Sequence, residues 1–323
     1  MTKSLSDYRL YIENALEELE LPSQPLNLYA PLSYFLSIGG KRMRPILALM
    51  GTELFATDYK QAKHAALAVE LFHNFTLIHD DIMDEAPLRR GKETVHKKWN
   101  QDIAILSGDT LMIEAYKQLC NYPPAILAKL LPLFNDTAIK VCEGQQWDMD
   151  FEQLKEVTIT AYLKMIEYKT AVLLGCSLQM GAIIGGASGN DAKDLYDFGV
   201  NLGVAFQIQD DILDVYADQS KFGKQVGGDI LANKKTYLLS IALEDSNATQ
   251  KKRFEDLFLE KDARVKVTGV KALYAELDIK RKATEKMNSF HKIALEKLEQ
   301  IAVLDVNKNP LRELAVFLLG REY

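Results

Sequence analysis

The pattern Asp-Asp-x-x-Asp occurs twice in this chain, each time at the end of a strongly apolar stretch with helical spacing. The first copy, DDIMD, covers residues 80–84, and the second, DDILD, covers residues 210–214. One copy alone can be a solvated acidic helix end, and it arises by chance in about 4% of chains of this length. Two copies, each at the end of a similar apolar helix, therefore indicate a shared chemical role.

Asp80 and Asp84 are four residues apart, which places them about 40° apart around a helix axis, so both carboxylates can meet one divalent cation. Oxygen ligands suit Mg²⁺, which keeps several waters and is usually shared with substrate phosphates. Crowded carboxylates also need a counter-charge. If the two acidic helices face each other across a bundle, their carboxylates project inward. The pattern then predicts a magnesium cluster around a diphosphate.

Apolar residues recur at three- and four-residue spacing over most of the chain, which predicts helices. The predicted helices are 4–20, 28–55, 60–84, 101–120, 125–147, 153–184, 190–216, 236–245, 262–277, 280–303 and 308–320. No alternating run bounded by hairpin turns indicates a sheet. No flexible linker divides the sequence, so an all-α fold in a single domain over residues 1–323 is predicted.

Composition excludes several classes of function. The net charge of −6 disfavours nucleic acid as the main partner, because phosphate backbones are bound by basic surfaces. No uninterrupted apolar run is long enough to cross a membrane, and the N-terminus lacks the apolar core of a signal peptide, so a cytoplasmic protein is expected. The three cysteines have no zinc spacing and are expected to be reduced, buried packing residues.

A basic group accompanies the first acidic motif. The segment GGKRMRP carries Lys41 and Arg44, His73 lies seven residues before the first aspartate, and Arg89 and Arg90 follow the motif. Guanidinium groups suit phosphate oxygens. Lys41, Arg44, His73 and Arg90 could form an anion site that needs no metal. The alternatives are a solvated basic turn, a core histidine with one hydrogen bond, and arginines that only neutralise the aspartates.

Further candidates lie near the second motif. Lys169 and Thr170 interrupt an otherwise apolar helix, and Gln207 lies three residues before Asp210. Lys224 and Lys234 flank a glycine-rich loop of the kind that closes over phosphates. The alternative for each lysine is a solvated or snorkelling side chain.

In order along the chain, GGKRMRP, LIHDDIMDEAPLRRG, YKT, FQIQDDILD, FGK and KKTY resemble the trans-isoprenyl diphosphate synthases, the family of farnesyl and geranylgeranyl diphosphate synthases. The resemblance implies a single all-helical bundle of roughly ten or more helices around a central active-site cavity. It also implies a homodimer and head-to-tail condensation of an allylic diphosphate with isopentenyl diphosphate. Roughly three Mg²⁺ ions per active site, bridged by diphosphate, are expected.

The resemblance assigns roles residue by residue. The expected magnesium ligands are Asp80, Asp84, Asp210 and, least surely placed by the motif, Asp214. Asp81 and Asp211 resemble supporting acids of the catalytic group. The isopentenyl diphosphate site would comprise Lys41, Arg44, His73 and Arg90. The groups that hold the allylic diphosphate would be Arg89, Lys169, Lys224 and Lys234, with Thr170 and Gln207 lining the allylic cation. Arg321 could cap the closed site or be a plain surface residue.

Product length should depend on the helix below the first motif. Thr76 and Phe72 lie one and two turns below Asp80, with Phe75 on the flank. Thr76 is small enough for a growing chain to pass, so the two phenylalanines would form the floor. Phe75 lies five positions before the first aspartate, which resembles short-chain enzymes of the geranylgeranyl type. A 20-carbon product is expected, with 15 carbons as the alternative. Both phenylalanines could also only pack the core.

Two rival functions remain at this stage. A class I terpene cyclase also ionises an allylic diphosphate on an aspartate-rich motif, but it needs no isopentenyl diphosphate site. A non-catalytic partner subunit of a heteromeric synthase should have lost acids or lysines, and none is lost here.

Overall fold

The structure is a computed structural model that describes residues 3–217 and 227–320. Two residues with predicted roles, Lys224 and Arg321, lie outside the described residues. The predicted all-α fold is confirmed, because the only strands in the described ranges are β1 (Leu88–Arg89) and β2 (Lys92–Glu93), which form a small hairpin.

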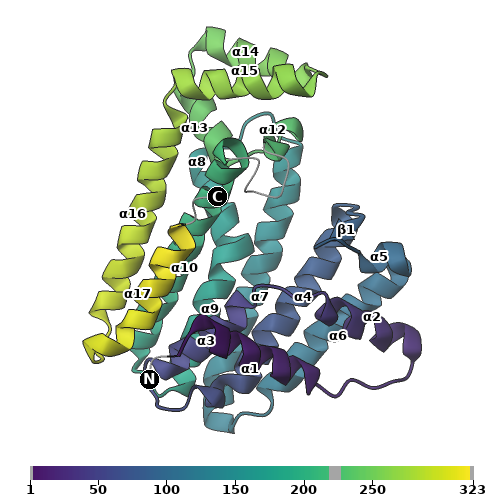
Figure 1. Cartoon of the computed structure of the whole chain (residues 1–323), viewed down its shortest axis with the longest axis vertical. Helices are drawn as coiled ribbons and strands as arrows, with labels where there is room; N and C mark the ends of the chain where they lie inside the picture. The colour runs from purple at the N-terminus through teal and green to yellow at the C-terminus, as the bar shows by residue number, and fades with distance from the viewer. Residues whose placement is uncertain (1–2, 218–226, 321–323) are drawn as a thin grey trace. The chain divides into compact units, whose positions relative to one another are not determined.

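The helices alternate with short connections along the chain (Figure 1). They are α1 (Leu5–Glu17), α2 (Leu26–Ser37), α3 (Met43–Glu53), η1 (Tyr59–Ala62), α4 (Lys63–Met83), α5 (Val95–Lys98), α6 (Gln101–Leu119), α7 (Pro124–Glu152), α8 (Ile159–Ile166), η2 (Glu167–Ala171), α9 (Val172–Ile184), α10 (Gly189–Tyr216), α12 (Gly228–Leu231), α13 (Tyr237–Asp245), α14 (Ala248–Leu259), α15 (Ala263–Glu276), α16 (Ile279–Gln300) and α17 (Asp305–Leu319).

Two predicted segments differ from the observed helices, and the observed helix α14 was not predicted. The single helix predicted over 28–55 is two helices, because Gly39, Gly40 and Arg42 have positive φ angles that no α-helix accommodates. The helix predicted over 153–184 begins only after Thr158, whose hydroxyl caps α8 by accepting from the amide of Ala161. It then passes through η2, a π-helix. Helix α14 was not predicted, since its sequence is dominated by charged residues.

The chain divides into two compact units. Unit 1 comprises Met1–Asn135 and Cys176–Leu195, and unit 2 comprises Asp136–Gly175 and Tyr196–Tyr323. Helices α7, α9 and α10 contribute residues to both units. The prediction of one domain over the whole chain stays a prediction.

In unit 1, α4 packs most extensively against α6 and also contacts α1 and α3. The face of α4 that enters this core includes fully buried residues such as Ala65, Leu71 and Phe72. Burial of that face fixes the rotation of the helix, and therefore the direction in which its C-terminal aspartates project.

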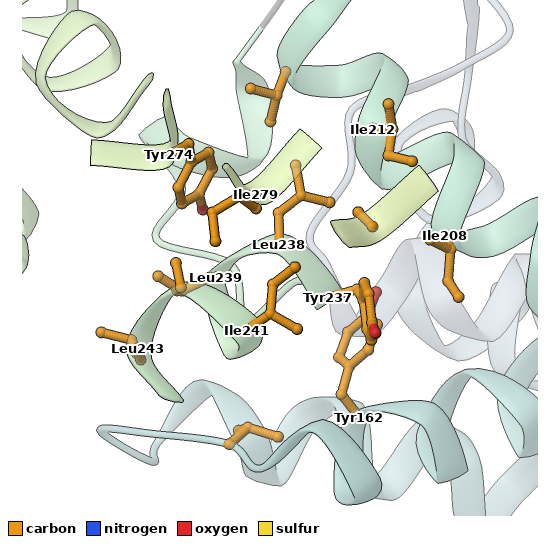
Figure 2. Close-up of a cluster of buried hydrophobic side chains, with 14 of the residues drawn as sticks. Tyr162, Ile208, Ile212, Tyr237, Leu238, Leu239, Ile241, Leu243, Tyr274 and Ile279 are labelled. Atoms are coloured by element: carbon orange, nitrogen blue, oxygen red, sulfur yellow. The ribbon is translucent and has the colours of Figure 1, made fainter. Parts of the chain in front are cut away.

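In unit 2, helices α8, α13, α15 and α16 share a core around buried residues of α10. Figure 2 shows Tyr162 of α8 and Tyr237 of α13 close to each other in this core, with ring centroids 6.3 Å apart. Ile208 and Ile212 extend the core along α10 toward the second acidic motif. That motif is consequently attached to a rigid, buried helix.

Two smaller expectations can be compared with the structure. Among the described residues, no helix combines the length and apolar character that crossing a bilayer requires. All three cysteines are free thiols, as expected. The expectation that they are buried is wrong for Cys120 and Cys142, which are exposed, and correct for Cys176. Cys120 is the residue that follows α6, and Cys142 lies on an exposed position of α7, which a count of cysteines does not reveal.

Candidate active site

The loop between α2 and α3 places a buried arginine at the start of α3. Arg42 has a φ of +53° and is the N-cap residue of α3. Its Nη1 donates to Oε1 of Glu70 at 2.5 Å, and its Nη2 donates to the carbonyl of Leu36 at 2.8 Å. The side chains of Arg42 and Glu70 are each only 4% exposed. A buried, paired charge at this point ties the loop to both α2 and α4.

Glu70 is held in turn by its own helix. The amide nitrogen of Asn74 donates to the backbone carbonyl of Glu70 at 2.7 Å and to its Oε1 at 3.1 Å. The carboxylate thus accepts from two donors, which is how a buried charge is stabilised. This Arg42–Glu70–Asn74 network fixes the backbone on which Lys41 and Arg44 lie.

Arg44 and His73 form a direct contact, with Nη1 of Arg44 3.0 Å from Nε2 of His73. A guanidinium can only donate, so Nε2 of His73 accepts and the proton of the neutral ring lies on Nδ1. Burial lowers the pKa of Arg44 to about 10, so this side chain stays charged at neutral pH. Burial first, and then Arg44 and Arg90, hold the pKa of His73 well below its usual value. The histidine is therefore a neutral hydrogen-bonding group among cations.

Arg90 reaches the same loop from the β1–β2 hairpin. Arg90 and Gly91 both have positive φ, which is the property of a type I′ turn. The guanidinium of Arg90 lies against Gly40, where an added Cβ would be 2.7 Å from Nη1. Burial and the neighbouring Arg42 lower the pKa of Arg90. Arg44, His73 and Arg90 thus lie near one another, and Lys41 is an exposed residue of the loop that contains Gly40. Their binding of a diphosphate stays a prediction.

The neutral state of His73 predicts a dependence of stability on pH. Below about pH 6.5 the unfolded chain takes up a proton that the folded chain does not, so the free energy of unfolding falls as the pH falls. Between pH 7 and pH 5, wild-type protein should therefore lose more of its free energy of unfolding than the His73→Gln variant. Urea denaturation of both proteins at the two pH values measures this difference, and identical losses would contradict it.

The three aspartates of the first motif have different surroundings. Asp81 is 1% exposed, and both of its oxygens accept from Nε of Arg89, at 2.9 and 2.8 Å. Asp80 is partly buried, and Asp84 is an exposed residue that caps the C-terminus of α4. The middle aspartate therefore anchors an arginine, and the predicted role of Asp80 and Asp84 as magnesium ligands stays a prediction. The ion pair gives Arg89 a structural role beside its predicted role toward a diphosphate.

The residues below the motif form an aromatic group. Phe72 is 1% exposed, with its ring 5.5 Å from Phe75 and 5.3 Å from Phe134. Phe75 is partly buried and lies edge-on to His79 at 4.7 Å. Thr76 donates its hydroxyl hydrogen to the carbonyl of His73. Phe72 is a core residue of unit 1 and packs against Phe134, and its predicted role as part of the floor stays a prediction.

In unit 2 the middle aspartate of the second motif is again a structural group. Oδ2 of Asp211 accepts from the hydroxyl of Tyr162 at 2.7 Å and from the backbone amide of Tyr237 at 2.8 Å. Burial raises the pKa of Asp211 to about 7, against the opposite effect of these two hydrogen bonds. The carboxyl group joins α8 and α13 to α10, and its role as a supporting acid of the catalytic group stays a prediction.

Asp214 organises the start of α12. Its Oδ2 accepts from the amide of Asp229 at 3.1 Å, and its carbonyl accepts from the amide of Gly227 at 2.7 Å. Lys234 is mostly exposed, with Nζ 3.9 Å from Oδ1 of Asp229. Asp210 is exposed. Asp210 is therefore the more accessible of the two magnesium ligands predicted in the second motif. Asp214 also accepts a hydrogen bond from the backbone of α12.

Lys169 and Thr170 lie on η2, the π-helix Glu167–Ala171. Nζ of Lys169 donates to Oδ2 of Asp148 on α7 at 2.5 Å. Both side chains are partly exposed, at 29% and 39%. Gln207 on α10 is partly buried. The lysine is thus held by a carboxylate and is not a freely snorkelling side chain.

The donor set fits magnesium that is bound together with a substrate. Within residues 3–217 and 227–320, no three His, Cys, Asp or Glu side chains form a group able to hold a metal alone. Each motif instead supplies two carboxylates at helical spacing, Asp80 with Asp84 and Asp210 with Asp214. Mg²⁺ in proteins is commonly held by one or two carboxylates, with waters and phosphates completing its shell.

Several residues that build these sites were not identified from sequence. They are Arg42, Glu70, Asn74, Asp148, Tyr162, Tyr237 and Gly144. A signal existed for Glu70, which is a single acid inside the apolar run AALAVELF. Asn74 lies one helical turn from Glu70. The other five pair with residues at least 21 positions away in sequence, so no local pattern marks them.

This all-helical fold is that of the isoprenoid synthases. The sequence pattern of the polyprenyl synthetases matches residues 25–277, and the chain belongs to this family. The predicted family and the predicted enzyme class, a prenyltransferase, are thereby confirmed.

Three similar proteins illustrate the relationship. A geranylgeranyl pyrophosphate synthase of Geoglobus acetivorans is 35% identical over all of both chains. A geranylgeranyl diphosphate synthase of Methanosarcina mazei is 41% identical over 72% of this chain and 73% of its own. A crystal structure of a geranylgeranyl pyrophosphate synthase superposes with a TM-score of 0.94, at 41% identity over all of both chains.

Proposed function

We propose that this protein condenses isopentenyl diphosphate head-to-tail with an allylic diphosphate, releases diphosphate, and makes geranylgeranyl diphosphate as its main product. The observation that carries the proposal is the basic group of Arg44 on α3, His73 on α4 and Arg90 in the turn of the β1–β2 hairpin. A terpene cyclase does not bind isopentenyl diphosphate, so it needs no second anion site. The names of the similar proteins support the 20-carbon product.

The side chains suit two different tasks. Arg44 and Arg90 supply guanidinium groups for the diphosphate of isopentenyl diphosphate, and the Nδ1–H of neutral His73 supplies a further donor. Lys169 and Lys234 supply ammonium groups for the allylic diphosphate, as Arg89 and Lys224 would. Bound Mg²⁺ supplies Lewis-acid stabilisation of the leaving diphosphate. Because negative charge on that group grows as the carbon–oxygen bond breaks, fixed cations favour the transition state over the bound substrate.

The allylic cation that forms needs dipoles and a dry pocket. The hydroxyl of Thr170 and the side-chain carbonyl of Gln207 provide oxygen dipoles without a strong nucleophile. The released diphosphate can accept the final proton, so no side-chain base is required. That both acidic motifs serve the same diphosphate, with roughly three Mg²⁺ ions, stays a prediction.

One assay separates the proposal from its rivals. The protein is incubated with Mg²⁺, labelled isopentenyl diphosphate and, in turn, dimethylallyl, geranyl or farnesyl diphosphate, and the products are chromatographed. Elongation to a 20-carbon diphosphate is the expected result. Cyclised hydrocarbon from farnesyl diphosphate would indicate a terpene cyclase, and the absence of turnover would indicate a non-catalytic partner subunit. A 15-carbon product would indicate a farnesyl diphosphate synthase.

Product length should respond to the aromatic floor. Replacing Phe75 by alanine removes a partly buried ring and should shift the main product from 20 to about 25 carbons, because truncation leaves unfilled volume. Adding Phe72→Ala should lengthen it further, although loss of a fully buried ring costs about 3–5 kcal/mol of stability. Chromatography of the dephosphorylated products measures the shift. Phe258→Ala, a partly buried ring of unit 2, is the control, and an unchanged spectrum in both floor variants would exclude this role.

The predicted homodimer and cytoplasmic location stay predictions. Leu106 and Ile113 support the homodimer, since each is 58% exposed and they are spaced by two turns on α6. The molecular mass in solution, measured by light scattering, tests it.

A further inference from the structure

Lys169 and Thr170 lie on a π-helical turn rather than on a regular α-helix. The segment η2, Glu167–Ala171, follows α8 and leads directly into α9. A π-turn is wider than an α-turn and amounts to one extra residue, so it persists only where the surroundings support it. Contacts with α7 and with α10 support η2 on its two sides.

On one side, η2 touches α7 at a glycine. A Cβ added to Gly144 would lie 2.2 Å from the backbone nitrogen of Lys169, 2.7 Å from its Cα and 2.7 Å from the carbonyl carbon of Tyr168. All three atoms belong to the backbone, so no change of side-chain rotamer relieves the overlap. One turn further along α7, Asp148 accepts from Nζ of the same lysine. Helix α7 thus holds Lys169 at both its backbone and its ammonium group.

On the other side, η2 touches α10 at a second glycine. A Cβ added to Gly203 would lie 2.8 Å from both Cα and Cβ of Ala171. Gly144 and Gly203 are both buried inside helices. Glycine in a helix interior costs about 1 kcal/mol relative to alanine. Both glycines allow η2 to approach α7 and α10 closely, and this packing offsets that cost.

We propose that Gly144 and Gly203 are positioning residues that set the place of Lys169 and Thr170, and thereby the ionisation of the allylic substrate. The inference rests on the proposed function and deepens it. The two glycines touch no substrate. They act because reacting groups displaced by about 1 Å lose roughly 100-fold in rate. The isopentenyl diphosphate site, which is built from residues of unit 1, should be unaffected.

The test compares Gly144→Ala and Gly203→Ala with Gly189→Ala, a glycine of α10 around which a Cβ would meet nothing within 4 Å. Gly144→Ala should lower kcat by roughly 100-fold and Gly203→Ala by roughly 10-fold, with the KM for isopentenyl diphosphate changed by less than about twofold. The control should match wild-type protein. Loss of folded enzyme alone would lower the active fraction equally for every substrate and appear as a lower melting temperature.

A second readout does not depend on turnover. Hydrogen exchange of the backbone amides of residues 167–172 should become at least about tenfold faster in both variants than in the control. If Gly144→Ala does not fold, Gly203→Ala decides by the same two measurements. An unchanged kcat, or unchanged exchange over this segment, in a folded variant would overturn the inference. If wild-type protein itself fails to elongate any allylic diphosphate, the proposed function fails, while the exchange result still tests the packing.

Discussion

Replacing Asp80 or Asp210 by asparagine should lower kcat/KM by about 10³-fold or more while leaving the protein folded. Asparagine keeps the shape of the side chain but removes the charge that binds a cation, and stabilisation of a leaving diphosphate by a bound cation is worth several kcal/mol. Neither side chain is deeply buried, so stability should change little. Steady-state kinetics at saturating Mg²⁺ and thermal melting measure the two effects.

The matched control is Asp102→Asn, an exposed aspartate in the first turn of α6, which should retain wild-type activity. Wild-type turnover in either motif variant would refute the role of that motif in metal binding. If only one variant is inactive, the two motifs do not serve the same diphosphate.

The largest expected effect on stability comes from Glu70. Glu70→Gln should lower the free energy of unfolding by about 3–5 kcal/mol, because it leaves the charge of Arg42 buried without its partner. Replacing both residues, as Arg42→Met with Glu70→Leu, should recover at least half of the loss, since well-packed apolar side chains avoid the desolvation of both ions. Urea denaturation of the wild type, Arg42→Met, Glu70→Leu and the double variant gives the coupling energy.

The exposed ion pair of Arg253 with Glu276 is the control for this cycle. Its two hydrogen bonds, at 2.8 and 2.9 Å, are well formed, yet both side chains are more than 40% exposed. Glu276→Gln should therefore cost less than about 1 kcal/mol. A loss of similar size for Glu70→Gln would mean that burial adds nothing to the Arg42–Glu70 pair.

Local patterns in the sequence predicted the helical fold and most of the candidate site, because both depend on short-range rules. The spacing of apolar residues located α4 and α10, and the acidic and basic motifs located Arg44, His73 and Arg90. The resemblance to a family then supplied the roles. The break between α2 and α3 was missed because apolar spacing continues through two glycines whose φ angles no periodicity reveals.

Long-range partners could not be predicted in this way. No residue near Asp211 in sequence indicates that its carboxyl group accepts hydrogen bonds from the hydroxyl of Tyr162 and the amide of Tyr237. Likewise, the contact of Gly144 with Lys169 joins residues that belong to different helices. Such pairs arise only when helices pack, and a single sequence carries no record of which pairs form.

The π-turn of η2 also limits how this chain can change in length. Its extra residue shifts every side chain of α9 by about 100° relative to a continuous α-helix from α8. Loss of one residue between Thr158 and Gly175 would therefore displace the side chains of α9, none of which is exposed. Insertions and deletions should be tolerated in the turn over 153–158 and be rejected in the stretch that follows it.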